Sequence, residues 1–171
     1  MQGRIRWDQE TEWLKAGLAG NGAFLIANTP TGISNPMTIG WGQVGIVWSR
    51  PVFSVYVRPS RYTFECLQRA KSFTVSVPRL GELSDELAFC GTKSGRDLDK
   101  ADACGLTFVP GRSVDTPVLA ACGLHYECSI LARSQLKKPD IVSDDVLRFY
   151  ESEPVHQITL GEILVAYVTK R

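Results

Sequence analysis

The feature that most constrains this fold is a series of strand-length segments that are not separated by regular helices. Six segments alternate in polarity or carry β-branched runs: Gly22–Asn28, Met37–Val47, Val52–Arg58, Phe73–Val77, Leu124–Ala132 and Gly161–Thr169. A doubly wound parallel sheet would need a crossover helix between its strands. The pattern therefore predicts a mostly β fold, an antiparallel β-barrel with two or three inserted helices.

Only two segments show a good helical period. The first is Arg61–Lys71, for which we expect Ser60 as the N-cap. The second is Leu83–Cys90, with Ser84 as a plausible cap, and a shorter helix is expected at Thr11–Ala16. The polar stretch 137–155 is typical of an exposed loop or a short helix. These helices are too few to change the β class of the fold.

The composition agrees with one domain over residues 1–171, because 44% of residues are hydrophobic and 22% are charged. Nineteen Lys and Arg against eighteen Asp and Glu leave a net charge of +1, which argues against nucleic acid or an anionic membrane as a partner. The longest apolar stretch, Ile163–Val168, has six residues where a membrane span needs about 20. We expect a cytoplasmic protein with no signal segment.

Cysteine usage indicates reduced thiols that fill the core. The five cysteines are at positions 66, 90, 104, 122 and 128. Cys122 and Cys128 would lie on one strand face but roughly 20 Å apart, too far for a disulfide. Since the sequence has only two histidines, a zinc site is not expected.

Two segments are similar to nucleotide-binding motifs, but each lacks a feature that its motif requires. Gly40–Gly45 matches G-x-G-x-x-G, but strand character continues through Ile46–Trp48 where a dinucleotide-binding motif needs a helix. Thr92–Ser94 is similar to the end of a P-loop, yet Thr92 occupies the position of a required glycine. No G-x-S-x-G sequence or carboxylate pair beside a histidine suggests hydrolysis.

The segment that begins at Met37 has little side-chain bulk on one face. Thr38, Gly40 and Gly42 would share that face of a continuous strand. A flat ligand would be able to lie against the exposed backbone there, although a bulge or close strand packing explains the glycines equally well.

Two segments concentrate phosphate-binding chemistry. Val57–Thr63 leaves a strand and enters a helix, and it places Arg58 and Arg61 beside the free N–H groups of the helix start. Gly91–Lys100 places hydroxyls and three cations in a glycine-bearing loop after a helix. Each segment alone is also consistent with an ordinary cap or a solvated basic loop. Together, in a nearly neutral chain, they predict a pocket for a small phosphorylated molecule.

Six segments taken together resemble the flavin reductase-like family of FMN-binding split barrels. They are Asn35–Trp41, Val55–Thr63, Phe73–Pro78, Cys90–Lys100, Leu124–Cys128 and His156–Leu164, and they occur in the order found in the family. The resemblance covers residues 20–168. It implies an antiparallel split β-barrel that forms a homodimer, with FMN near the dimer interface.

The resemblance also implies a set of cofactor-binding residues. Asn35, Thr38 and Trp41 would contact the flavin region. Arg58, Ser60, Arg61, Tyr62 and Thr63 would hold the phosphate end and its approach. Ser94, Gly95, Arg96 and Lys100 would complete the phosphate and ribityl contacts. His156 would approach from the last strand, where a purely structural histidine is an equal alternative.

The implied function is an FMN-dependent oxidoreductase of the flavin reductase type, with NAD(P)H as co-substrate. Because the flavin itself accepts hydride, no catalytic side chain is expected. The alternative is a flavoredoxin-like carrier that moves electrons between redox partner proteins without a nicotinamide. A third hypothesis is a split-barrel protein that binds another ligand. The first two cannot be separated from the sequence, because no nicotinamide-specific motif is recognisable.

Overall fold

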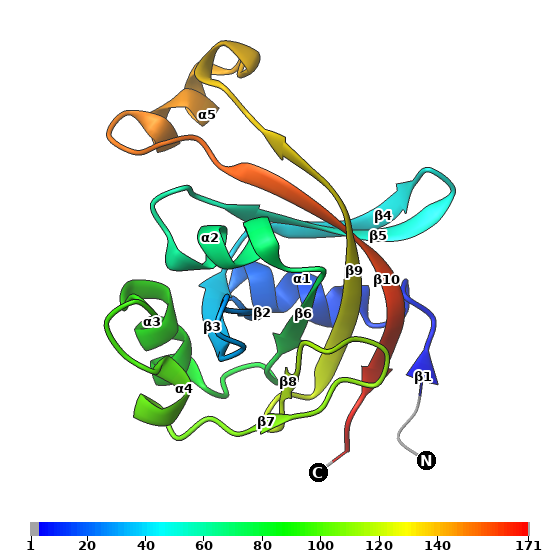
Figure 1. Cartoon of the computed structure of the whole chain (residues 1–171). Coiled ribbons are helices and arrows are strands. Elements are labelled where there is room, and N and C mark those ends of the chain that lie inside the picture. Colours follow the sequence, from blue (N-terminus) through cyan, green and yellow to red (C-terminus); the bar gives the residue numbers. More distant parts are fainter. Residues whose placement is uncertain (1–3, 171) are drawn as a thin grey trace.

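The chain folds into an open barrel built almost entirely from antiparallel strands (Figure 1). The computed structural model describes residues 4–170. Its main sheet has eight strands in the order β3-β2-β6-β9-β10-β5-β4, with β1 paired to β10. These strands are β1 (Arg4–Ile5), β2 (Ala23–Asn28), β3 (Ser34–Ile39), β4 (Gly42–Val47), β5 (Arg50–Val57), β6 (Ser72–Val77), β9 (Leu124–Gln135) and β10 (Gln157–Val168). Every pairing in the sheet is antiparallel, and β3 and β4 end its order unpaired to each other within these residues. The expected antiparallel split β-barrel is therefore confirmed.

Aromatic side chains fill the interior of the barrel. The Phe53 ring lies 5.3 Å from the Tyr126 ring and 6.5 Å from the Phe73 ring, both in edge-to-face arrangements. Helix α1 (Thr11–Ala19) adds Leu14 to this cluster, and α2 (Tyr62–Arg69) adds Leu67. Full burial of each large apolar side chain contributes about 1.5–3 kcal/mol. The two helices are thereby held on the barrel by their apolar faces.

Strand β2 is buried on both faces. Leu25 points into the barrel core, whereas Phe24 and Ile26 belong to a second apolar cluster outside it. Helices α3 (Ser84–Thr92) and α4 (Lys100–Ala103) cover that outer face, together with the small ribbon of β7 (Phe108–Val109) and β8 (Val118–Leu119). This packing places the loop between α3 and α4 beside β3, at the open side of the barrel.

The β9–β10 hairpin extends beyond the barrel as an arm, defined here as residues 136–156 (Figure 1). It contains η1 (Lys138–Asp140), α5 (Asp144–Leu147) and η2 (Arg148–Tyr150). Most of its side chains are exposed, as expected for a loop with short helices, but Tyr150 and His156 are buried. The arm is therefore attached to the barrel at a few points only.

The structure corrects three local predictions. The single strand predicted over 37–47 is wrong, because β3 ends at Ile39 and β4 begins at Gly42, on opposite edges of the split. Thr38 and Gly42 therefore share no strand face. Ser60 is not the N-cap of α2; the extended backbone of Arg61 takes that position, with no side-chain hydrogen bond. Ser84 is the first residue of α3, whose N-cap is Leu83 in the left-handed region at φ 55°.

The cysteines are core residues, as predicted. All five are free; Cys66, Cys90, Cys122 and Cys128 are buried, and Cys104 is partly exposed. Burial raises the pKa of each thiol, so these side chains behave as small apolar groups. Over residues 4–170 no helix has the length and apolar character needed to span a membrane.

Candidate functional site

Three adjoining cavities follow the open side of the barrel between β3, α2 and the α3–α4 loop. We name them by their surroundings. The aromatic cavity, about 260 Å³, is lined by residues that include Trp41, Tyr56 and His156. The central cavity, about 60 Å³, is lined mainly by the start of α2 and by residues 90–95 with Lys100. The turn cavity, about 230 Å³, lies between the β2–β3 turn and residues 95–100.

Shared wall residues make the three cavities neighbours. Met37, Arg61 and Gly91 line both the aromatic and the central cavity. Tyr62, Gly95 and Lys100 line both the central and the turn cavity. The central cavity, with its cations and hydroxyls, thus lies between two larger spaces.

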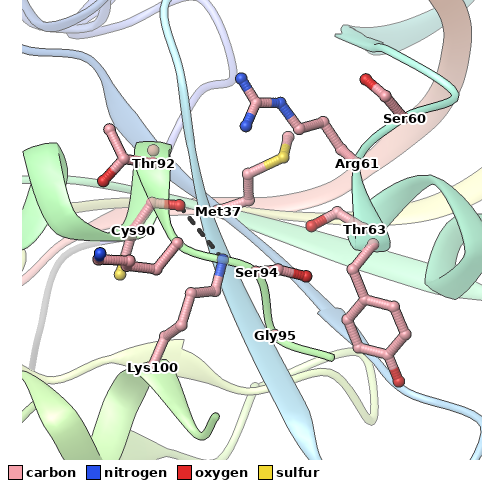
Figure 2. A pocket seen from close by; sticks show the side chains of 12 residues that line it. Met37, Ser60, Arg61, Thr63, Cys90, Thr92, Ser94, Gly95 and Lys100 are labelled. Carbon is pink, nitrogen blue, oxygen red and sulfur yellow. Dashed lines mark hydrogen bonds between the residues drawn. The ribbon is translucent and has the colours of Figure 1, made fainter. Parts of the chain in front are cut away.

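Lys100 is the most unusual residue of the central cavity. It is 3% exposed, and its Nζ donates to the carbonyl of Cys90 at 3.2 Å (Figure 2). Burial lowers the pKa of its ammonium group, and the nearby positive charge of Arg61 lowers it further. No carboxylate within residues 4–170 forms a salt bridge with it. A buried cation without a counter-charge is costly, so this cavity favours an anion.

Local structure explains why Lys100 points inward. Asp99 is the N-cap of α4, and its Oδ1 accepts from the N–H groups of Ala101 at 2.9 Å and Asp102 at 3.1 Å. Ala101 packs into the outer apolar cluster. The cap and this anchor together fix the first residue of the helix on the cavity side. Figure 2 shows Arg61 entering from the N-cap of α2 and Lys100 from the opposite side, with Met37 between them.

The loop before Lys100 is packed tightly onto β3. A Cβ atom on Gly95 would collide with Oδ1 of Asn35 and lie 3.0 Å from Cδ1 of Tyr62. Asn35 is buried, and its Nδ2 donates to Oγ1 of Thr63 at 2.8 Å. Asn35 and Thr63 therefore position each other and the loop. Arg96 forms an ion pair with Glu65 and lies 5.3 Å from the centroid of the Tyr62 ring.

Arg58 lies apart from the central cavity. Its Nη1 is 3.3 Å from Oε2 of Glu153, and its Nη2 donates to the carbonyl of Phe149 at 3.3 Å. The guanidinium also lies 5.9 Å from the ring centroid of Tyr150. Arg58 thus lines the aromatic cavity and binds the arm, whereas Ser60, Arg61, Tyr62, Thr63, Ser94, Gly95 and Lys100 line the central cavity.

Aromatic rings in edge-on and tilted contact lie at one wall of the aromatic cavity. The ring of Trp41 lies 4.7 Å from that of His156 and 5.4 Å from that of Phe149. The Tyr150 hydroxyl and Nδ1 of His156 are 3.0 Å apart. Burial, with the positive charges of Arg58 and Arg61, lowers the pKa of His156 to about 4, so the imidazole is neutral at pH 7. The Thr38 hydroxyl donates to the carbonyl of Leu87 at 2.6 Å and is already paired.

Several wall residues were not predicted from the sequence. Met37, Tyr56 and Thr92 line the cavities, and Phe149 and Tyr150 of the arm contact the wall residues Trp41 and His156. The only available signal for the last two was an aromatic pair within a polar stretch.

This arrangement can hold an anion in the central cavity and a flat ring system against Trp41. An open antiparallel barrel with such cavities along its split defines the class of ligand-binding split barrels. Residues 18–168 match the model of the flavin reductase like domain, so the chain belongs to the flavin reductase-like family. This match supports a flavin-related redox function.

Solved structures share the fold. Flavoredoxin from Methanosarcina acetivorans is 26% identical, with a TM-score of 0.69 over 86% of this chain and 68% of that chain. Flavoredoxin of Desulfovibrio vulgaris (Miyazaki F) is 22% identical, with a TM-score of 0.68 over 86% and 69%. An NADH:FAD oxidoreductase of Streptomyces globisporus C-1027 is 18% identical, with a TM-score of 0.65 over 86% and 74%.

One curated relative, an uncharacterized protein of Archaeoglobus fulgidus, is 31% identical over 97 residues. The match covers 57% of this chain and spans about half, 54%, of the relative.

Proposed function

We propose that this protein is an FMN-binding oxidoreductase of the flavin reductase type that takes hydride from NAD(P)H. The observation that carries the proposal is the buried, unneutralised ammonium group of Lys100 beside Arg61 in the central cavity. A phosphate group matches it in charge and in hydrogen-bonding capacity. The family match supports a flavin as the bearer of that phosphate.

The residues present fit a flavin phosphate. Lys100 and Arg61 would neutralise the phosphate, and the hydroxyls of Ser60 and Ser94 would donate to it. Trp41 and His156 would flank the ring system in the aromatic cavity. A bound flavin supplies hydride acceptance and electron transfer.

The side chains of this protein would orient the bound flavin and exclude water from it. Neutral His156 is held by its contact with Tyr150, so this part of the wall carries no charge at pH 7. Phe149 packs edge-on against Trp41 from the arm and covers part of the Trp41 ring. No general acid or base is required of these side chains for hydride transfer.

The first experiment measures flavin binding by the wild-type protein and by two charge variants. Lys100→Met and Arg61→Ala should each weaken FMN binding about 10- to 100-fold, as expected for loss of a charge-assisted contact. Arg58→Ala is the matched control and should weaken it much less, because Arg58 binds the arm. The free energy of unfolding of the FMN-free Lys100→Met variant should equal or exceed that of the wild type, since a buried charge has been removed. Unchanged FMN affinity in both cavity variants would contradict the proposal.

The second experiment identifies the electron donor. The flavin-loaded protein is mixed anaerobically with NADH or NADPH, and loss of the oxidised-flavin absorbance is followed. Bleaching by a nicotinamide supports the reductase. The resemblance in fold to two flavoredoxins favours an electron carrier as the second candidate. Bleaching by reduced ferredoxin, with no response to either nicotinamide, would select the carrier.

We also propose that the protein is a homodimer. The β4–β5 hairpin projects from the barrel and exposes Ile46 (59%) and Trp48 (63%) (Figure 1). Exposed large apolar side chains of this kind favour association. Light scattering should give twice the chain mass for the wild type and a shift toward monomer for Ile46→Lys and Trp48→Lys. A wild type that is monomeric at all concentrations tested would reject the homodimer.

A further inference from the structure

Two of the five cysteines lie together beside the central cavity. Cys90 belongs to the outer apolar cluster, Cys104 packs against that cluster, and the Cys90 thiol donates a hydrogen bond to the sulfur of Cys104. Cys90 is buried and lines the central cavity, whereas Cys104 is partly exposed. Both thiols pack as small apolar groups in the reduced protein. Because they touch, they can also form a disulfide when an oxidant reaches Cys104 from solvent.

Lys100 connects this thiol pair to the chemistry of the central cavity. Its Nζ donates to the carbonyl of Cys90 at 3.2 Å (Figure 2), and its own carbonyl accepts from the N–H of Cys104 at 3.2 Å. Lys100 is the first residue of α4, and Cys104 is the C-cap of the same helix. The two residues are therefore about one helical turn apart. A change in the position of Cys104 is transmitted to Lys100 through that turn.

The surroundings of the two sulfurs assign them different roles. Burial and the carboxylate of Glu86 raise the pKa of Cys104, while the hydrogen bond from Cys90 and the ammonium group of Lys100 lower it. Burial and the neighbouring Cys104 raise the pKa of Cys90 to about 12. Only a thiolate attacks a disulfide. Cys104, which is also the exposed member, is therefore the attacking thiol, and Cys90 is the thiol that completes the bond.

We propose that Cys90 and Cys104 form a redox-sensitive disulfide, driven by a low-molecular-weight disulfide such as oxidised glutathione, that controls anion binding through Lys100. Cys104 loses its proton to solvent and attacks one sulfur of glutathione disulfide, which releases one glutathione thiolate. Cys90 then loses its proton and attacks the sulfur of Cys104, so that the internal disulfide forms and the second glutathione leaves. Two protein thiols are oxidised, and one glutathione disulfide is reduced to two thiols.

Formation of this disulfide should displace Lys100. The sulfurs of a disulfide are about 2.0 Å apart, much closer than two thiols in a hydrogen bond. Helix α3 is fixed to β3, because the Thr38 hydroxyl donates to the carbonyl of Leu87 at 2.6 Å and Leu87 is buried in the outer cluster. The four-residue helix α4 is therefore the part that moves, and Nζ of Lys100 leaves the Cys90 carbonyl. We expect the oxidised protein to bind FMN about 10-fold more weakly.

The coupling must act in both directions. If the disulfide weakens FMN binding about 10-fold, saturating FMN favours the dithiol form by the same factor. For a two-electron couple a tenfold change is about 30 mV, so FMN should raise the midpoint potential of the thiol pair by about 30 mV. This coupling rests on the proposed function, since it takes FMN as the ligand of the central cavity, whereas formation of the disulfide does not.

The first experiment counts thiols in the FMN-free protein after equilibration with mixtures of reduced and oxidised glutathione. The wild type should lose two of its five free thiols, and peptide mapping should join Cys90 to Cys104. Cys104→Ser should keep all of its remaining thiols. Cys122→Ala is the matched control, because Cys122 is buried in the same cluster, and it should still form the disulfide. Five free thiols at every glutathione ratio, a stable glutathione adduct on Cys104, or a disulfide between other cysteines would overturn the inference.

The second experiment titrates FMN into the dithiol and disulfide forms and measures the midpoint potential with and without FMN. Cys104→Ser should bind FMN like the reduced wild type whatever the glutathione ratio. A disulfide that leaves FMN affinity within about twofold would overturn the control through Lys100. Failure of the proposed function is distinguishable, because then neither form binds flavin. The thiol count still decides the disulfide in that case, and inorganic phosphate replaces FMN as the probe of the central cavity.

Discussion

Two buried tyrosines of the barrel, Tyr126 and Tyr167, differ in how their hydroxyls are paired. The Tyr126 hydroxyl has no hydrogen-bond partner within residues 4–170, whereas that of Tyr167 donates to Oε1 of buried Glu127 at 2.9 Å. Glu127 also accepts from the backbone N–H groups of Arg112 and Ser113. Loss of a partner from this network leaves an acceptor less satisfied, while loss of an unpaired hydroxyl leaves nothing unsatisfied.

Tyr126→Phe should therefore leave the free energy of unfolding unchanged or raise it by up to about 1 kcal/mol, and Tyr167→Phe should lower it by about 1–3 kcal/mol. Urea unfolding at neutral pH measures both variants against the wild type. A larger loss for Tyr126→Phe than for Tyr167→Phe would show that the Tyr126 hydroxyl is paired in solution.

Gly95 is a second residue at which the addition or loss of a single atom should change stability and binding. In Gly95→Ala the new methyl group displaces Asn35 or the loop, so we expect FMN affinity to fall at least about 10-fold, with about 1–3 kcal/mol lost from stability. Gly45→Ala is the control, because a Cβ there has nothing within 4 Å. Titration with FMN and urea unfolding compare the two variants. Equal behaviour would mean that the loop is loosely held.

Single residues also show how far the sequence predicts the site. The loop cations and hydroxyls were predictable, because glycines and cations cluster locally at residues 91–100. It was not predictable that Lys100 lines the central cavity while Arg58 binds the arm. The position of Arg58 depends on Glu153 and Phe149, which lie more than 90 residues from it in sequence. Burial of Lys100 likewise requires α3 and α4 to pack on β2, and no local sequence pattern predicts that packing.

At the scale of elements, the arm is held to the barrel mainly by Arg58 and by the rings around Trp41. Arg58→Gln should therefore release the arm and increase cleavage within residues 137–155 in limited proteolysis, with little change in the unfolding midpoint. Arg148→Gln, which removes only an exposed pair with Asp145, is the control and should be cleaved like the wild type. Cleavage of Arg58→Gln at the wild-type rate would show that the rings alone hold the arm.

Elements differed in how well their patterns predicted them. Strands β2, β5 and β6 were predicted within two residues at each end, because each carries an uninterrupted apolar face. The alternation of polarity failed to predict the end of β3 at Ile39. Alternation continues through Gly40 and Trp41, where the chain crosses the split to β4. Strands β9 and β10 extend further than predicted, since their outer ends pair with each other in polar sequence next to the arm.

At the scale of the whole molecule, the barrel was predictable because strands without crossover helices pack only as an antiparallel sheet. The position of the split was not. It depends on β3 and β4 lying on opposite edges of one sheet although they are consecutive in sequence. The candidate site lies along that split, so its residues come from segments far apart in the chain.

Acid should destabilise the whole fold through its two histidines. Burial lowers the pKa of His125 to about 4, and burial with Arg58 and Arg61 lowers the pKa of His156 to about 4. Each pKa is near 6.5 in the unfolded chain, so between pH 6.5 and pH 4 the unfolded state binds more protons. The stabilisation is complete above pH 6.5 and is lost as the pH falls toward 4, by roughly 1.4 kcal/mol per pH unit for each histidine.

Urea unfolding between about pH 7 and pH 5 measures this slope. His156→Gln should make it shallower by about one proton, whatever its effect on stability at pH 7, because the group that takes up the proton on unfolding is gone. The pH at which the stability begins to fall should remain the same, since His125 still titrates. An unchanged slope in His156→Gln would mean that His156 has the same pKa in the folded and unfolded states, and the wall of the aromatic cavity would then gain a positive charge below about pH 6.5.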